Sequence, residues 1–282
     1  MQEFSIHHRR LFLRYYVIIF YILALYYWIN GMFLYQLQPI IFRTPFDGTN
    51  WLLMQTGIHQ WLMNNQAGCL VFDIIYYLSP LAYWWLCEKK QIASRLLFGI
   101  FWTIFNWIYI LCYVLFPSNS IEGHLAGLLL PILFSTRRIA SFYYMLHGVR
   151  YFFLFFFVSA GLWKLRSGGV FNIDQMSGIL LMQHKEFLIA SPGYWYTSFI
   201  YWIIRNPTIG YSLYLISTLL ELVFSIGFFT KKYDKQLFFL FILFLITNSI
   251  IMRMVYLDAL PLALPLLFTR PVLNQVTVDK TL

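Results

Sequence analysis

Residues 151–165 read YFFLFFFVSAGLWKL, an almost uninterrupted apolar stretch with a lysine at position 164, one residue before its end. Similar apolar stretches recur along the 282 residues, which are 60% hydrophobic and only 11% charged. A soluble domain of this length has roughly 25% charged residues. A deficit this large, spread over the whole chain, predicts an all-α, polytopic helical membrane protein.

Apolar stretches that approach the roughly 17–25 residues needed to cross a bilayer divide the chain into about eight spans within a single transmembrane domain, residues 1–282. The fourth and eighth are short, so either is open to a re-entrant arrangement, and Pro261 and Pro265 predict a kink in the eighth. Two long aromatic loops, 31–70 and 166–207, are expected to form interfacial helices and loops. The eight expected spans cover residues 11–29, 71–87, 94–116, 122–136, 148–165, 208–230, 236–254 and 255–270.

The positive charges predict the orientation of these spans. The net charge is +9, but the basic residues punctuate apolar segments instead of forming a stripe, so no nucleic-acid partner is expected. If the N-terminus is cytoplasmic and the spans alternate, most of the 20 Lys and Arg residues fall on the cytoplasmic side, as the positive-inside rule requires. Both termini are then cytoplasmic, and Lys164 and His124 lie on the extracytoplasmic side. The three cysteines show no metal-binding spacing, and no metal is expected.

Lys164 is open to two interpretations. Long cationic side chains near the end of a span commonly extend to the membrane interface, and Arg166 two residues later favours that reading. Alternatively, a lysine in an apolar site can lose its proton and act as a general base, which an arginine cannot do. His124 is likewise either a polar residue at a helix start or a group that binds a developing anion or carries a proton.

Other ionisable residues within or beside the spans are expected to be structural, intramembrane polar groups. Glu221 is the most deeply placed carboxylate, and a structural pair and a proton relay are equally open for it. Arg253 and Asp258 are expected to pair across the turn before the last span, and Asp73 to serve as an anion at the start of a helix. His59 and His184 are expected to be loop residues.

The segment from Val158 to Pro192 resembles the membrane core of vitamin K-dependent gamma-carboxylases and the broader HTTM superfamily. Ala160, Gly161, Lys164 and Leu165 match that family's Ala-Gly-x-x-Lys-Leu motif, and Lys164 falls on its catalytic lysine. Upstream, Glu122-Gly123-His124 resembles the family's helix start and places His124 on its active-site histidine. The resemblance covers about residues 70–250.

The resemblance implies a bacterial inner-membrane protein with an extracytoplasmic pocket of Lys164 and His124. A reduced quinone similar to vitamin K hydroquinone would be deprotonated there, supporting the modification or maturation of a secreted peptide such as a bacteriocin. The chain departs from the animal enzymes because it ends soon after the last span and has no histidine after His184. Two alternatives therefore stay open. The first is a non-enzymatic membrane protein that takes part in toxin-peptide maturation or immunity, with membrane lipid and an operon-encoded membrane protein as its partners. The second is a DoxX-like subunit of a quinone-linked oxidoreductase.

Overall fold

The computed structural model describes residues 6–37, 48–88, 92–114, 124–253 and 259–269, and all of the regular structure in these ranges is helical. Six helices are long and apolar enough to cross a membrane, so the chain is an integral membrane protein. They correspond to the predicted spans other than the fourth and the eighth. The candidate spans are His7–Gln36, Gln66–Cys87, Arg95–Val114, Ile139–Arg166, Pro207–Phe229 and Asp234–Met252.

The two short predicted spans are not membrane-length helices in the described ranges. Helix α6, Leu125–Phe134, has 10 residues and is about 15 Å long, roughly half the thickness of the hydrocarbon core. The part of the eighth span that the structure describes is broken into two single turns, α13 (Leu260–Ala263) and α14 (Pro265–Phe268). Each turn has a proline in its first positions, where the missing N–H group costs no intrahelical hydrogen bond.

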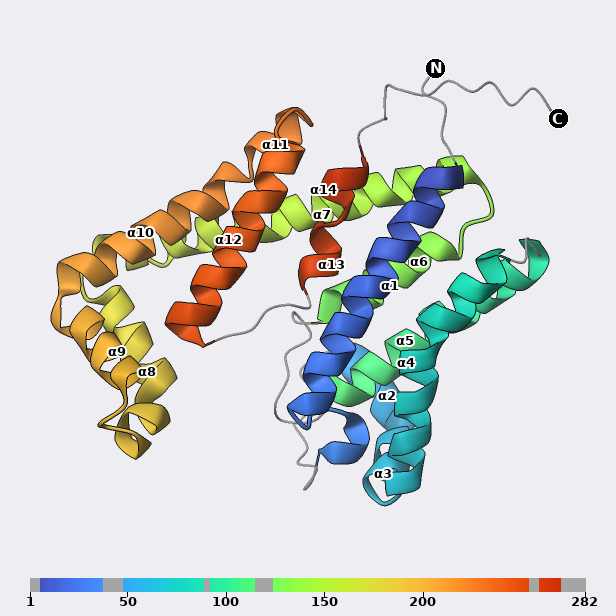
Figure 1. Cartoon of the computed structure of the whole chain (residues 1–282), viewed down its shortest axis with the longest axis horizontal. Coiled ribbons are helices and arrows are strands. Elements are labelled where there is room, and N and C mark those ends of the chain that lie inside the picture. Colours follow the sequence, from blue (N-terminus) through green and yellow to red (C-terminus); the bar gives the residue numbers. More distant parts are fainter. Residues whose placement is uncertain (1–5, 38–47, 89–91, 115–123, 254–258, 270–282) are drawn as a thin grey trace. The chain divides into compact units, whose positions relative to one another are not determined.

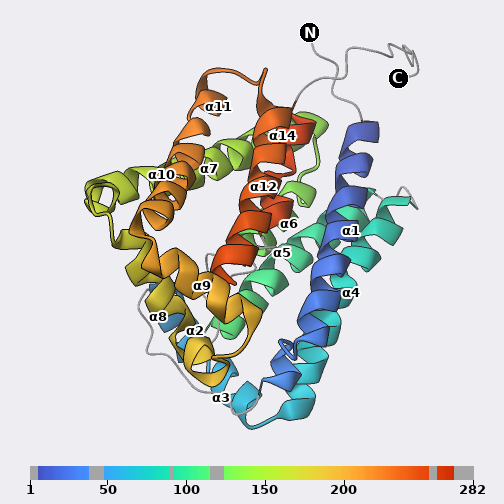
Figure 2. The same ribbon diagram turned by 60° about the vertical axis from the view of Figure 1, so that its left-hand side comes forward.

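Within the predicted single domain, the chain divides into two compact units, each described here by itself. Unit 1 comprises residues 1–149 and 258–282, and unit 2 comprises residues 150–257. The boundary falls inside helix α7, Ile139–Arg166. Figures 1 and 2 show α7 as one continuous helix in green and yellow-green.

Unit 1 is built on the helices α1 (Ile6–Ile29), α4 (Gln66–Glu88), α5 (Ile92–Val114) and α6, with the short helices α2 (Gly48–Gln55) and α3 (Ile58–Met63). Aromatic side chains form its core: the rings of Trp102 and Phe134 are stacked, with centroids 5.6 Å apart, and Tyr83 lies against both. Gly99 of α5 lies so close to α6 that an added Cβ would be 2.8 Å from the carbonyl oxygen of Phe134. Large rings and one small residue thus hold α5 and α6 together.

Arg9 joins the first turns of α1 to the end of α6. Its guanidinium donates hydrogen bonds to the carbonyl oxygens of Phe134 and Thr136 and to the Tyr83 hydroxyl, each at 3.1 Å. The last carbonyl groups of a helix have no partner within the helix, so this arginine satisfies groups that α6 leaves free. The first helical turns of α7 reach the same place, since His8 bonds the Tyr143 hydroxyl at 3.0 Å. Within unit 1, therefore, α6 returns the chain to the N-terminal end of α1 before α7 begins.

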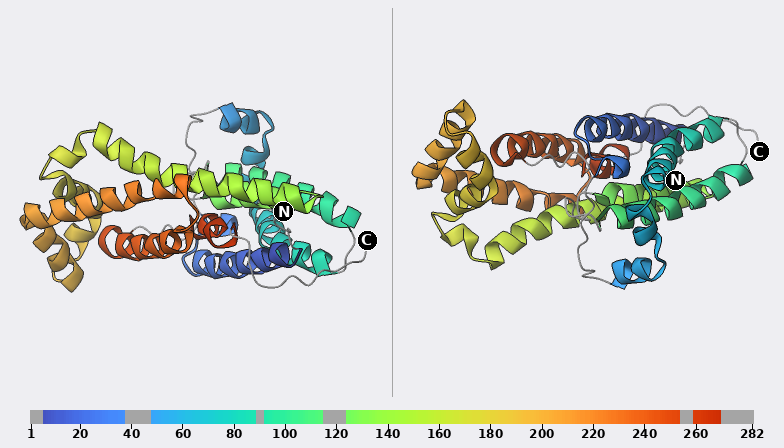
Figure 3. Two further views of the ribbon diagram at one scale, coloured as in Figure 1. Left: turned by 90° about the horizontal axis from the view of Figure 1, so that it is seen from above. Right: turned by 90° about the horizontal axis from the view of Figure 1, so that it is seen from below.

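Unit 2 combines the last part of α7 with α10 (Pro207–Val223), the single turn α11 (Ile226–Phe229) and α12 (Asp234–Met252). Figure 3 shows α7 and α10 side by side in this unit. Phe157 contacts Phe224 and Phe241, with ring centroids 4.8 Å and 5.1 Å apart, and Phe153 contacts the same two rings. This aromatic cluster joins α7 to the segment after α10 and to α12.

A fully buried ion pair closes one end of unit 2. The Arg150 guanidinium donates to both carboxylate oxygens of Asp234, at 2.8 Å and 2.6 Å, and to the carbonyl oxygen of Gly227 at 2.7 Å. Both charged side chains have 0% exposure. Burial and the nearby Arg150 charge lower the pKa of Lys231 in the adjoining turn. The bidentate geometry, with an extra backbone acceptor, compensates for removing two charges from water.

The other end of unit 2 is closed by helices α8 (Gln175–Ala190) and α9 (Trp195–Arg205), which pack against each other and against α10. Side chains of these two helices bond the free backbone carbonyl groups at the end of α12. His184 bonds the carbonyl oxygen of Ile251 at 2.9 Å, and the Tyr196 hydroxyl donates to the carbonyl oxygens of Ile250 and Ile251. Side chains from elsewhere in unit 2 thus cap the C-terminus of α12, as Arg9 caps α6 in unit 1.

We predict that Arg150→Met lowers the free energy of unfolding of the protein by about 3–5 kcal/mol, because it leaves the Asp234 carboxylate buried without its cation. The measurement is reversible unfolding in detergent. The matched control is Arg166→Met on the same helix, where the arginine is exposed and only a small change is expected. Adding Asp234→Leu to Arg150→Met should restore part of the loss. An Arg150→Met protein as stable as the control would contradict a stabilising role for this pair.

Candidate functional site in unit 2

Lys164 lies in the last turn of α7 and points at α10. Its ammonium nitrogen donates to Glu221 Oε1 at 2.8 Å and to Ser217 Oγ at 3.1 Å. The nitrogen also lies 5.5 Å from the centre of the Tyr214 ring. The charge of Lys164 thus faces a carboxylate, a hydroxyl and an aromatic ring. A lysine that only extended to the membrane interface would not need these three partners.

The partners of Lys164 come from one face of α10. Tyr214, Ser217 and Glu221 are spaced by three and four residues, which places them in successive turns on the same side of a helix. Gly161, one turn before Lys164 on α7, allows the close approach: an added Cβ would lie 3.0 Å from the Leu222 side chain and 3.2 Å from Glu221 Cβ. The glycine of the Ala-Gly-x-x-Lys-Leu motif thus has a packing role beside the lysine.

Lys164 and Glu221 differ in how far their side chains are exposed. The side chain of Lys164 is 24% exposed, whereas that of Glu221 is 6% exposed. The second carboxylate oxygen, Glu221 Oε2, is buried and has no hydrogen-bond partner in the described part of the chain. A buried carboxylate next to an ammonium group can exist as a charged pair, or as a neutral amine and a carboxylic acid after one proton moves. Of the two groups, the amine is the more accessible end of the pair.

His124 belongs to unit 1, where it immediately precedes α6. Its ring lies against Tyr113 and Tyr27, with centroids 5.0 Å and 6.4 Å apart. His124 is buried in this position, with 8% of its surface exposed. His124 and Lys164 lie in different units, and their joint action stays a prediction.

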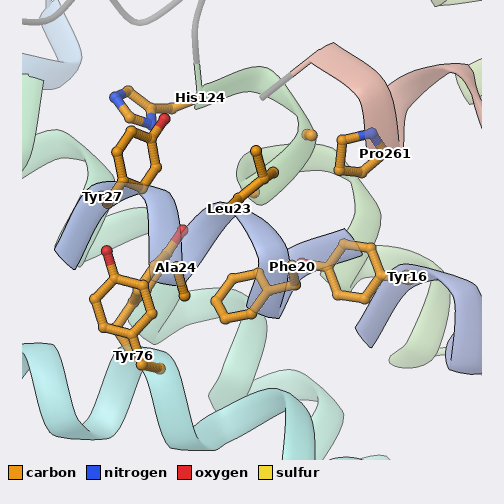
Figure 4. Close-up of a pocket in the computed structure, with 11 residues that line it drawn as sticks. Tyr16, Phe20, Leu23, Ala24, Tyr27, Tyr76, His124 and Pro261 are labelled. Carbon is orange, nitrogen blue, oxygen red and sulfur yellow. The ribbon is translucent and has the colours of Figure 1, made fainter. Parts of the chain in front are cut away.

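A small pocket lies beside His124. It is lined mainly by α1, with further residues from α4 and from the start of α6, and Figure 4 shows Tyr16, Tyr27, Tyr76 and His124 around it. The volume of the pocket is about 40 Å³. Binding sites for small organic ligands usually have about 300–1,000 Å³, so this pocket holds water-sized groups and not a quinone ring.

Asp73 has a role that differs from the predicted one. Helix α4 begins at Gln66, so Asp73 lies about two turns inside it and is not an anion at the helix start. Its carboxylate accepts the backbone N–H groups of Leu34 and Tyr35, at 3.2 Å and 3.0 Å, and the hydroxyl of Tyr109 at 2.6 Å. Asp73 thus fixes the 3-10 helix η1, Leu34–Gln36, against α4.

The remaining predicted residues have mixed outcomes. His59 and His184 were expected in loops, but they are buried in helices α3 and α8, because the apolar residues around them form helices that pack inside their units. The guanidinium of Arg253 stacks on the Phe187 ring at 4.2 Å. Asp258 lies outside the described residues, so its pairing with Arg253 stays a prediction.

Arg150, Asp234, Ser217 and Tyr214 were not identified as site residues from the sequence. For Arg150 a signal was present: an arginine directly before a run of apolar residues in a helix requires a carboxylate partner, and Asp234 follows a basic turn. For Ser217 the signal was its position four residues before Glu221. In the described residues there is no cluster of three or more metal-ligating side chains. Comparisons with family models, curated proteins and solved structures give no match to this chain.

We predict that Gly161→Val separates α7 from α10 and breaks the contact between Lys164 and Glu221, because its Cβ meets Leu222 and Glu221 at 3.0–3.2 Å. The stability of the variant should fall by about 1–3 kcal/mol, as is usual for overpacking. Gly148→Val on the same helix is the matched control, since an added Cβ there meets no atom within 4 Å. Equal stability of the two variants in detergent would rule out a tight contact at Gly161.

Proposed function

We propose that this integral membrane protein is an enzyme that uses Lys164 to exchange a proton with a substrate arriving from the membrane, with Glu221 as the internal partner of the lysine. The observation that carries the proposal is the 2.8 Å contact between a partly exposed amine and a buried carboxylate. A lysine that only extends to the membrane interface needs no buried carboxylate, whereas a proton-transferring amine needs a group that accepts and returns its proton.

The proposed proton transfer has two steps. In the first, the proton of the Lys164 ammonium moves to Glu221, which leaves a neutral amine and a carboxylic acid. In the second, the amine accepts a proton from a hydroxyl group of the substrate, which leaves the substrate as an anion beside a lysine that is charged again. Ser217 holds the lysine nitrogen in place during both steps.

The resemblance to the HTTM superfamily suggests that this substrate is a reduced quinone and that the product serves the modification of a secreted peptide. Lys164 and Ser217 can both hydrogen-bond a quinol hydroxyl, and Lys164 is partly exposed. A bound quinol would supply an acidic hydroxyl group and reducing electrons. His124 belongs to the other unit, so we assign the quinol to Lys164 and give His124 no step.

The orientation of the site is part of the proposal. We propose that the chain changes sides of the membrane between the end of α5 and the start of α7, so that α7 runs outward like α1. The hydrogen bonds of Arg9 to the end of α6, and of His8 to Tyr143, support this direction. Both termini are then cytoplasmic, Lys164 faces the extracytoplasmic side, and a bacterial inner membrane is the proposed location.

The contact between Lys164 and Glu221 also supports a second, non-enzymatic function, in which the ion pair only holds two helices together. An ion pair between α7 and α10 is also a means of fixing two helices, and such a role needs a charge but no proton transfer. The chain would then be a non-enzymatic membrane partner in the maturation of a secreted peptide or in immunity to it. Lysine and arginine separate the two functions, because arginine keeps the charge and does not release a proton.

We expect membranes that contain the protein to convert reduced vitamin K and oxygen into the quinone epoxide, and Lys164→Met and Lys164→Arg each to lower that rate by about 10²–10⁴-fold. The measurement is chromatography of extracted quinones, with membrane insertion checked for each variant. Lys185→Met is the matched control, because Lys185 is exposed on α8 and should leave the rate unchanged. Wild-type activity in Lys164→Arg would refute proton transfer and leave the structural role. A wild-type protein without epoxide formation would exclude quinol oxygenation.

A further inference from the structure

Helix α9 exposes a stripe of aromatic and cationic side chains. Trp195 is 67% exposed, Trp202 is 52% exposed and Tyr201 is 37% exposed, and Ser198 and Arg205 are exposed as well. Positions 195, 198, 202 and 205 recur every three to four residues, so they lie on one side of the helix. These five residues are called the α9 stripe below.

The opposite side of α9 is part of the core of unit 2. Tyr196, Ile200 and Ile203 are buried in one cluster with residues of α8 and α10, among them Leu180 and Tyr214. Figure 3 shows α8 and α9 packed together near one end of α7 and α10. The α9 stripe is therefore not needed to fold unit 2, and its exposed rings require a different explanation.

The dimensions and composition of α9 match the boundary between lipid head groups and acyl chains. Its 11 residues span about 16 Å, too short to cross a bilayer. Tryptophan and tyrosine are enriched at this boundary because their rings are apolar while their polar atoms remain hydrated, and arginine binds lipid phosphate. The Arg205 guanidinium lies 5.7 Å from the centre of the Tyr201 ring, so cation and aromatic ring form one surface.

The chain connection supports the same location. Asn206 alone separates α9 from Pro207, the first residue of the apolar helix α10. Its side chain bonds the carbonyl oxygen of Trp202 at 2.7 Å, so the end of α9 is held at this junction. Helix α10 is long and apolar enough, with the turn that follows it, to cross the membrane. Its first residue therefore marks the level at which the chain enters the hydrocarbon.

We propose that α9 lies in the head-group layer of the membrane, with the α9 stripe in contact with phospholipid. Contacts inside unit 2 connect α9 to the lysine site. Tyr214 is a member of the cluster that holds α9, and its ring lies 5.5 Å from the Lys164 nitrogen. Because Lys164 bonds Ser217 and Glu221, which follow Pro207 by 10 and 14 residues, its nitrogen lies about 15–21 Å along α10 from the junction with α9. This inference does not depend on the proposed enzymatic function.

The test is to place a fluorescent probe at position 198, in the middle of the stripe. Ser198→Cys keeps all four large side chains of the stripe, and the three native cysteines are buried. The labelled protein is reconstituted into phosphatidylcholine and phosphatidylglycerol vesicles that contain nitroxide lipids. The nitroxide is attached either near the head group or near the end of the acyl chain. Ile216→Cys, exposed near the middle of α10, is the control for the hydrocarbon, and Lys232→Cys is the control for water.

We expect the probe at position 198 to lose most of its fluorescence with the shallow nitroxide and little with the deep one. The Ile216→Cys probe should show the reverse order, and the Lys232→Cys probe should respond mainly to a water-soluble quencher. Stronger quenching at position 198 by the deep nitroxide would place α9 in the hydrocarbon and refute the proposal. Quenching at position 198 only by the aqueous reagent would refute it too, because the stripe would then face water or a soluble partner.

Discussion

A charge in apolar surroundings must be paired or neutralised, and this constraint accounts for the main polar contacts of unit 2. Arg150 is fully buried and therefore holds Asp234 with two hydrogen bonds. Lys164 reaches Glu221 on the neighbouring helix. Without water, each such charge has few acceptable partners, so each pair also fixes which helices lie together. In a core made mostly of interchangeable aromatic rings, these pairs supply the specificity that apolar packing does not.

The same constraint applies to the ends of helices. A helix that stops inside the protein leaves carbonyl groups without partners, and here side chains from distant segments satisfy them. Arg9 does so for α6, and His184 with Tyr196 does so for α12. His184, which the sequence suggested as a loop residue, and Arg9, which it suggested as a topogenic charge, therefore bond backbone carbonyl groups inside their units. Their polarity is used within the fold, not at its surface.

The sequence predicted the all-α class and six of the eight spans because apolar length is a local property. It also indicated that the fourth span is short, but it did not predict the exact ends of α6, since hydropathy alone does not report where a helix begins or ends. For the site, the sequence identified Lys164 and Glu221 as unusual charges but left their pairing open. Their contact depends on Gly161 and on the register of α10 against α7, which are properties of the packed pair. Ser217 was missed because a serine in an apolar helix usually bonds its own backbone.

Pairing changes what the lysine can do. An isolated lysine in hydrocarbon simply becomes neutral, whereas a lysine beside a carboxylate keeps a proton within the pair and can return it. In the proposed function, the difference in exposure gives the pair a direction: the amine would meet the substrate, and the carboxylate would stay inside. Burying both groups equally would strengthen the attraction between the charges, but it would also raise the cost of removing them from water. The uneven burial of Lys164 and Glu221 is the feature on which the proposed proton transfer depends.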